Sequence, residues 1–357
     1  MKLTSYDLHR VHLAPPRLIG DSQACSAPSG DRSGIAHRPG FSGVGFDLQQ
    51  GTPTPPLAHL KKQFEAGAWK TLKEGTPWGL ALKLTRPRGG NVGGGYLTLP
   101  VETALWDLLA KEQQVPLYRL LGGTNPRVPA YGSTLDFHLT DEDFRKRLHE
   151  FKEMGFRAVK TKVGHPSLEW DLRRLQIVHE IFGKDVTLMV DANEAWSPKE
   201  ALARIHAYRE AGIRLFWLED PIDRNDFTGL RRLCEEAGDT RINTGEYLGF
   251  SGKRQLLEQH AVDVLNIHGS ISMSRAAAHL AGDYGIPVSL GNTLLEIGVH
   301  LAASLPECLF LEYSDLSWNR LAENPVEFKE GYAIAPDRPG HGLTLNLAVL
   351  ADCSRAD

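Results

Sequence analysis

Short, almost wholly apolar segments alternate in the middle of the chain with stretches in which apolar residues recur at helical spacing. Four short segments, residues 158–162, 186–191, 215–219 and 242–246, end on Lys162, Asp191, Glu219 and Glu246, and the second and third of them are apolar almost throughout before that end. Successive charged ends lie 29, 28 and 27 residues apart, about the length of one strand, one helix and two short loops. The pattern predicts repeated strand–helix units, with each charge at the carboxyl end of a buried parallel strand.

The stretches between these segments carry signals for helix starts. Thr140 precedes Asp143 by three residues, and Ser197 precedes Glu200 in the same way, so each pair places a capping hydroxyl before an acid in the first turn. Helices that alternate with buried strands indicate a parallel α/β sheet. If that sheet closes into a barrel, the charged strand ends gather at one mouth, where the active sites of such barrels lie.

Three carboxylates and two lysines would meet at that mouth. Asp191, Glu219 and Glu246 would repel one another unless a cation compensated their charge. Carboxylate ligands without Cys or His suit a hard ion such as Mg²⁺. Lys160 and Lys162 are alternate residues of one strand and share a face. Because an ammonium beside another cation has a lowered pKa, such a lysine can act as a base near neutral pH.

These motifs resemble, in order and spacing, those of the mandelate racemase branch of the enolase superfamily. The motifs are Lys160-Thr-Lys162, Asp191-Ala-Asn193, Glu219-Asp-Pro221 and Gly245-Glu246. The resemblance implies a modified TIM barrel, (β/α)7β, with an α+β capping domain built from the N-terminal region and the C-terminal tail. We therefore expect residues 1–125 to form the cap, 126–325 the catalytic barrel, and 326–357 a segment that returns to the cap.

The resemblance also implies a reaction. Mg²⁺ held by Asp191, Glu219 and Glu246 would assist removal of the proton next to a substrate carboxylate, giving an enediolate. Lys162 would be the base, and Lys160 would lie beside it.

The sixth and seventh predicted strands depart from the family pattern. Members with a two-sided site carry an Asp and a His there, opposite the lysine. This chain has Asn266 or His268 at the end of the sixth strand and Gly291 or Asn292 at the end of the seventh. The sixth strand also lacks the lysine of the muconate lactonizing branch.

This departure favours a hydro-lyase that dehydrates a sugar acid, an aldonate or aldarate, to a 2-keto-3-deoxy acid. A racemase, epimerase or cycloisomerase acting on a carboxylate is the first alternative. A non-catalytic relative that only binds a carboxylate is the second.

Further residues are candidates for contact with the small carboxylate substrate. His268 could replace the missing acid, although a histidine at a strand end is often structural. Asn193, Asn292, Glu312 and His37 could bind substrate. Asn193 could instead be a turn residue, and His37 an exposed loop residue.

Composition limits the remaining functions. The chain has 357 residues, which favours two domains, and its net charge of −4 gives no sign of a nucleic-acid partner. No apolar run approaches 18 residues, so we expect no membrane span. Four scattered cysteines without a CxxC pair indicate reduced thiols and a cytoplasmic location. Capped barrels of this kind commonly associate, so a homo-oligomer is expected.

Overall fold

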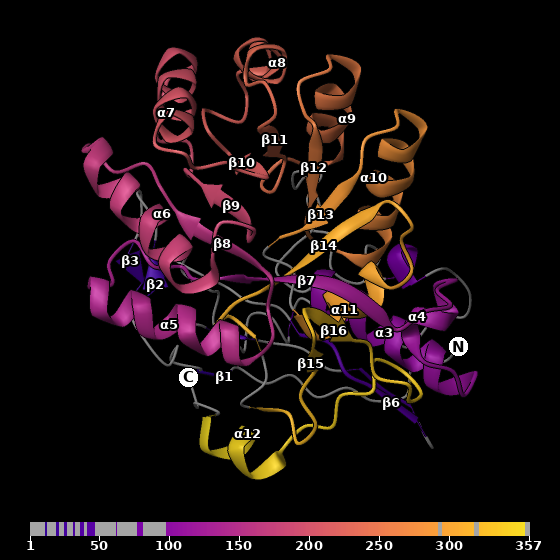
Figure 1. The fold of residues 1–357 in the computed structure, drawn as a ribbon. Coiled ribbons are helices and arrows are strands. Elements are labelled where there is room, and N and C mark those ends of the chain that lie inside the picture. The colour runs from indigo at the N-terminus through magenta and orange to yellow at the C-terminus, as the bar shows by residue number, and fades with distance from the viewer. Residues whose placement is uncertain are drawn as a thin grey trace.

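The computed structural model describes most of the chain from residue 98 onward. The described residues are 98–291, 295–317 and 321–353, together with the shorter stretches 11–12, 19–20, 25–26, 31–32, 36–38, 41–46, 62 and 77–80. Within them, eight parallel strands form a ring, because each strand pairs with the next and the last pairs with the first (Figure 1). The strands are β7 (Arg127–Ser133), β8 (Ala158–Lys162), β9 (Thr187–Asp191), β10 (Trp217–Glu219), β11 (Arg241–Thr244), β12 (Val264–Ile267), β13 (Val288–Leu290) and β14 (Cys308–Tyr313).

One helix separates each pair of successive barrel strands. These helices are α5 (Asp141–Glu153), α6 (Leu168–Phe182), α7 (Pro198–Glu210), α8 (Phe227–Glu236), α9 (Phe250–Glu258), α10 (Ile271–Asp283) and α11 (Leu295–Ala302). The predicted (β/α)7β barrel is therefore confirmed.

The predicted capping residues start their helices as expected. The Asp143 backbone N–H donates to Thr140 Oγ1 over 3.1 Å, and the Glu200 N–H donates to Ser197 Oγ over 3.3 Å. These hydroxyls satisfy donors that lack a partner in the first turn of a helix. The start of α5 and of α7 is thus fixed locally, close to the strand that each helix follows.

The strand register brings the charged ends into one row. Lys162 pairs with Asp191, and Asp191 pairs with Glu219, across β8, β9 and β10. Glu219 pairs in turn with Asn243 of β11, and Glu246 follows that strand by two residues. Equal depth in neighbouring strands therefore places the charges at the same end of the barrel.

Aromatic and apolar side chains fill the barrel on the other side of this row. Tyr131, Met189 and Trp217 are fully buried and pack together with Phe310. The rings of Tyr131 and Trp217 meet edge to face with centroids 5.5 Å apart. Trp217 is a core residue, as the sequence indicated, and this layer closes the barrel beneath the charged residues.

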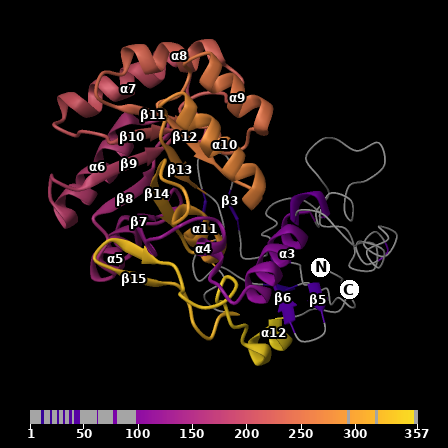
Figure 2. The same ribbon diagram turned by 90° about the vertical axis from the view of Figure 1, so that its right-hand side faces the viewer.

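Segments from both ends of the chain pack beside the barrel. Figure 2 shows the hairpin of β5 (Ala36–Arg38) and β6 (Phe41–Gly43) on one side of it, next to α3 (Thr98–Glu112), and α12 (Leu347–Cys353) on the same side. The remaining elements are α4 (Leu117–Leu120), β15 (Glu327–Lys329), β16 (Tyr332–Ile334), and the pairs β1 (Val11–His12) with β4 (Asp31–Arg32) and β2 (Ile19–Gly20) with β3 (Cys25–Ser26).

These segments are joined to the barrel and to one another. Strand β16 pairs antiparallel with β7, and the Asp107 carboxylate of α3 accepts the backbone N–H groups of Val44 and His341. The boundaries at residues 125 and 325 stay predictions. None of the helices in the described ranges is long and apolar enough to cross a membrane.

Candidate active site

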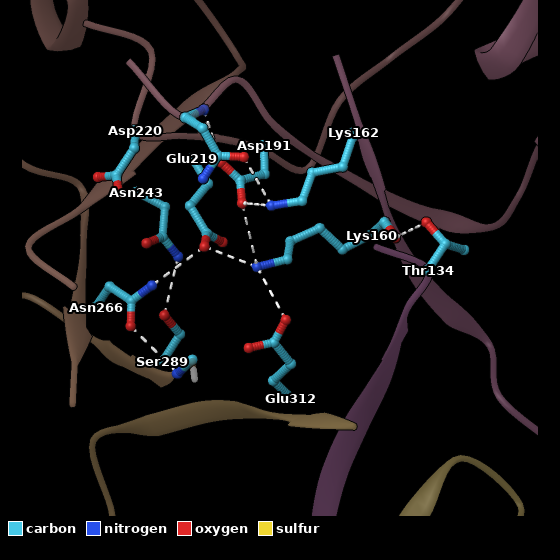
Figure 3. A network of polar contacts seen from close by, with 12 residues as sticks. Thr134, Lys160, Lys162, Asp191, Glu219, Asp220, Asn243, Asn266, Ser289 and Glu312 are labelled. Carbon is cyan, nitrogen blue, oxygen red and sulfur yellow. Dashed lines mark hydrogen bonds and ion pairs between the residues drawn. The ribbon is translucent and has the colours of Figure 1, made fainter. Parts of the chain in front are cut away.

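Lys160 lies at the centre of a buried charged cluster at the barrel mouth (Figure 3). Its Nζ is 2.7 Å from Glu219 Oε1, 3.1 Å from Glu312 Oε1 and 3.8 Å from Asp191 Oδ2. The four side chains come from β8, β10, β14 and β9. The predicted residues Lys160, Asp191, Glu219 and Glu312 are thus brought together.

Lys162 occupies the next inward position of β8. Its Nζ is 2.6 Å from Asp191 Oδ2 and donates to Asn193 Oδ1 over 2.7 Å. Its backbone N–H donates to Asp136 Oδ1 over 3.0 Å, and Asp136 is fully buried. Both the backbone and the amine of Lys162 are therefore oriented by carboxylate groups.

The charge of Lys160 is set by its acidic neighbours. Burial by itself lowers the pKa of Lys160, but the carboxylates of Glu219 and Glu312 raise it well above its usual range. The lowered pKa expected from the sequence concerns the base, Lys162, and stays a prediction; the pKa of Lys160 moves the other way because two acids contact its amine. Lys160 is a lasting positive charge in the cluster.

The three predicted metal ligands differ in their ionisation. Burial raises the pKa of Asp191, but the ammonium groups of Lys162 and Lys160 and the hydrogen bonds from Lys162 and the Asn193 N–H together outweigh this effect, and the pKa lies below its usual range. Burial raises the pKa of Glu219 well above its usual range. Burial, and then the charge of Asp220, raise the pKa of Glu246 to about 8. Two of the three carboxyl groups are therefore harder to ionise than usual, because the lysines at the mouth do not balance the charge that all of the buried acids would carry together.

The carboxylate oxygens at the mouth suit a hard cation as ligands, although the ammonium of Lys160 lies among them. With the side chains in their present positions, no three His, Cys, Asp or Glu residues of the described ranges are arranged to hold a metal ion. Glu219 Oε2, however, is buried without a hydrogen-bond partner among these residues. A buried carboxylate oxygen is costly to leave unpaired, and oxygen donors are those that Mg²⁺ prefers. These side chains therefore fit a divalent cation that replaces Lys160 at Glu219.

The strands facing Lys162 carry amides and a hydroxyl. Asn266 Nδ2 of β12 donates to Glu219 Oε1 over 3.3 Å, and its Oδ1 accepts the Gly291 N–H over 3.2 Å. Asn243 of β11 donates to Ser289 of β13 over 2.9 Å. Figure 3 shows these side chains next to the charged cluster.

The other predicted site residues are placed less fully. His268 directly follows β12 and is partly buried. His37 lies in β5, where the structure describes the backbone only, and Asn292 falls outside the described residues. The parts assigned to these three residues stay predictions.

Sequence reasoning did not select Asp136, Asn243 or Ser289. Asp136 follows a barrel strand as a carboxylate, so a signal for it was present three residues beyond β7. Asn243 and Ser289 are neutral residues inside β11 and β13, and neither is a charged strand end. Because their hydrogen bond joins residues 46 positions apart in the chain, no local pattern indicated it.

Comparisons with known proteins agree with this geometry. The family model described as "Enolase C-terminal domain-like" matches residues 143–349. The 3,6-anhydro-alpha-L-galactonate cycloisomerase of Streptomyces coelicolor is 34% identical over 265 residues, 71% of each chain. The crystal structure of a candidate mandelate racemase from Mesorhizobium loti has a TM-score of 0.90 and 42% identity, covering 99% of this chain and 95% of that one.

Other relatives point to the same family and to a metal. The L-talarate dehydratase of Polaromonas sp. JS666, crystallised with Mg and L-glucarate, has a TM-score of 0.85 and 26% identity, covering 99% of this chain and 98% of that one. Further relatives are arabinonate and L-talarate/galactarate dehydratases and an L-Ala-D/L-Glu epimerase. These relatives are thus sugar acid dehydratases, a cycloisomerase and epimerases. The chain belongs to the enolase superfamily as a mandelate racemase/muconate lactonizing enzyme-like protein.

Proposed function

We propose that this protein is a Mg²⁺-dependent hydro-lyase that dehydrates a sugar acid, an aldonate or aldarate, to a 2-keto-3-deoxy acid. The observation that carries the proposal is the chemical difference between the two sides of the barrel mouth. An amine with two hydrogen-bond acceptors lies on one side, whereas Asn266 bonded to the Gly291 N–H lies on the other. An amide cannot take a proton near neutral pH, so this arrangement favours a reaction driven by one base.

Asp191, Glu219 and Glu246 would hold the cation. All three are buried, and Glu219 Oε2 has no partner within the described part of the chain. Bound Mg²⁺ would supply positive charge where the substrate carboxylate gains electron density. Lys160, with its raised pKa, would keep a second positive charge close to the same point.

Lys162 would act as the base in its neutral form. It would take the proton from the carbon next to the substrate carboxylate, and Asp191 and Asn193 would orient its amine. The protonated Lys162 would then return that proton to the β-hydroxyl as the C–O bond breaks. Water leaves, and the resulting enol becomes the 2-keto acid. The proton is conserved, and no further reactant is needed.

Three other residues would assist. Glu312, 3.1 Å from Lys160, and Asn193 would contact substrate oxygens. His268 would be an alternative acid for the leaving hydroxyl, because it follows β12 directly. His37 and Asn292 stay candidates for substrate contact.

A panel assay tests the proposal. Purified protein with MgCl2 is incubated with aldonic and aldaric acids of both hydroxyl configurations at each carbon, and 2-keto-3-deoxy products are detected as semicarbazones. We expect at least one acid to be dehydrated, with the reaction lost after EDTA and recovered with excess Mg²⁺. No product from any acid would contradict the proposal.

Cycloisomerisation or epimerisation is the second candidate, favoured by the 34% identity to a cycloisomerase. Both reactions begin with the same proton removal but do not release water. Reactions in D2O separate the possibilities. Deuterium in recovered or epimerised substrate, without a keto product, would support this second function.

A further inference from the structure

Arg224 connects the three loops that follow β9, β10 and β11. From the loop after β10 it forms a bidentate ion pair with Glu194, using Nε and Nη2, with Nη2 2.6 Å from Glu194 Oε2. Its backbone N–H also donates to Glu194 Oε1 over 2.9 Å. Its guanidinium carbon lies 4.5 Å from the ring centroid of Tyr247, which follows Glu246 in the chain. One side chain therefore contacts the loops next to all three predicted metal ligands.

The same loops contain unusual backbone conformations. Asn193, Glu194 and Asp220 have φ of 47°, 62° and 37°, values that residues with a Cβ seldom adopt. The Glu194 N–H donates to the Asp220 carbonyl over 2.7 Å, so the strained segments after β9 and β10 are joined. Such conformations persist where surrounding contacts enforce them, and they gather at functional sites. The Arg224–Glu194 pair is a contact of this kind.

A shift in these loops would reach the reacting groups directly. Asn193, next to Glu194, accepts from Lys162 Nζ over 2.7 Å, and its N–H donates to Asp191 Oδ1 over 2.9 Å. Asp220, next to Glu219, accepts from the Thr244 hydroxyl over 2.5 Å. Arg224 itself is not among these contacts.

We infer that Arg224 is a positioning residue that, through Glu194 and Tyr247, holds the metal-binding carboxylates and Lys162 in working geometry. The inference rests on the proposed function. A flat guanidinium is required, because it binds both carboxylate oxygens and stacks on a ring at once. Lysine keeps the charge but lacks this geometry, so Arg224→Lys separates geometry from charge.

The test compares Arg224→Lys, Glu194→Gln and their double variant with the unmodified protein. Mg²⁺ affinity is measured by calorimetric titration with MgCl2, without substrate, and kcat and KM are measured on the best acid of the panel. We expect each single variant to weaken Mg²⁺ binding about 10-fold, as loss of groups that orient metal ligands does. The value of kcat should fall more than KM rises. The double variant should bind Mg²⁺ no more weakly than the single variant with the lower affinity, because both changes remove the same interaction.

Arg209→Lys is the matched control. Arg209 also pairs with an acid, since its Nη2 is 2.9 Å from Asp239 Oδ1, but this pair links α7 to the loop before β11. Its Mg²⁺ affinity and kcat should stay within twofold of the unmodified values. If Arg224→Lys fails to fold, Glu194→Gln and Tyr247→Leu decide the question, because Tyr247 is 51% exposed and tolerates truncation.

The outcomes separate the two proposals. Mg²⁺ affinity and kcat within twofold of the unmodified protein in both Arg224→Lys and Glu194→Gln would overturn the positioning function and leave the dehydratase proposal intact. If Arg224→Lys does not fold, the same result in Glu194→Gln and Tyr247→Leu would overturn it. An unmodified protein that binds no Mg²⁺ at millimolar concentration would overturn both proposals. Weakened Mg²⁺ binding without any dehydrated acid would support the positioning function and contradict the substrate assignment.

Discussion

Along β8 to β11 the strand ends carry lysines and carboxylates, whereas β12 and β13 present an amide, a hydroxyl and a backbone N–H. On the first side, Lys162 Nζ contacts Asp191 over 2.6 Å. On the second, Asn266 lies between Glu219 and the Gly291 N–H. The neutral side supplies hydrogen bonds to the charged side without adding charge. Removal of the substrate proton by a base is therefore expected from one direction only.

Helix α11, which follows β13, also contains a buried residue that stays uncharged. His300 of α11 is fully buried. Its Nδ1 accepts the Tyr118 N–H over 3.2 Å, and its Nε2 is 2.9 Å from the His341 carbonyl, to which it can only donate. One neutral tautomer satisfies both contacts. Burial lowers the pKa of His300 to about 4, so this histidine stays uncharged at neutral pH.

Of the changes predicted for the two sides, removal of the Lys162 amine should have the largest effect, and this effect should be on kcat. We expect Lys162→Met to lower kcat by about 1,000-fold or more, because a positioned base contributes 10²–10⁴-fold and the amide of Asn266 across the mouth cannot take its place. Initial rates on the best acid of the panel measure this. Lys199→Met, at an exposed lysine of α7, serves as the control. A loss below tenfold would show that the neutral side also supplies a base.

Loss of stability in acid, caused by protonation of His300 on unfolding, should be the second-largest effect. The pKa of His300 is about 4 in the folded protein and about 6.5 when unfolded, so below pH 6.5 the unfolded chain binds more protons. Stability is fully retained above pH 6.5 and falls towards pH 4. Between pH 7.5 and pH 5 the loss attributable to His300 should be about 2 kcal/mol.

Urea unfolding at these two pH values measures the effect. His300→Gln should lose less stability between pH 7.5 and pH 5 than the unmodified protein. His206→Gln, at a histidine whose side chain is 72% exposed, should behave like the unmodified protein. An equal pH dependence in His300→Gln would show that His300 is not held neutral.

The sequence predicted the charged side better than the neutral side, for a physical reason. Lys162, Asp191 and Glu219 recur once per strand–helix unit, and the parallel register converts that spacing into proximity. The hydrogen bond between Asn266 and Glu219 joins residues 47 positions apart across the closed barrel, and closure has no local signal. The charge state of Lys160 depended on the same closure, because Glu312 reaches it from the last strand.

Adding charge to the neutral side should have the smallest effect of the three. Asn266→Asp replaces the amide that donates to Glu219 Oε1 over 3.3 Å with a second carboxylate. The lost hydrogen bond and the new repulsion should reduce the free energy of unfolding by about 1–2 kcal/mol without Mg²⁺. Saturating Mg²⁺ should recover part of this loss, because a cation held by Glu219 offsets the added charge. Urea unfolding with and without MgCl2 measures both changes.

Asn125→Asp is the matched control, because its side-chain oxygen accepts the Arg127 N–H at an exposed position and an aspartate can do the same. Equal stability of Asn266→Asp and Asn125→Asp would mean that the neutral side does not depend on its lack of charge.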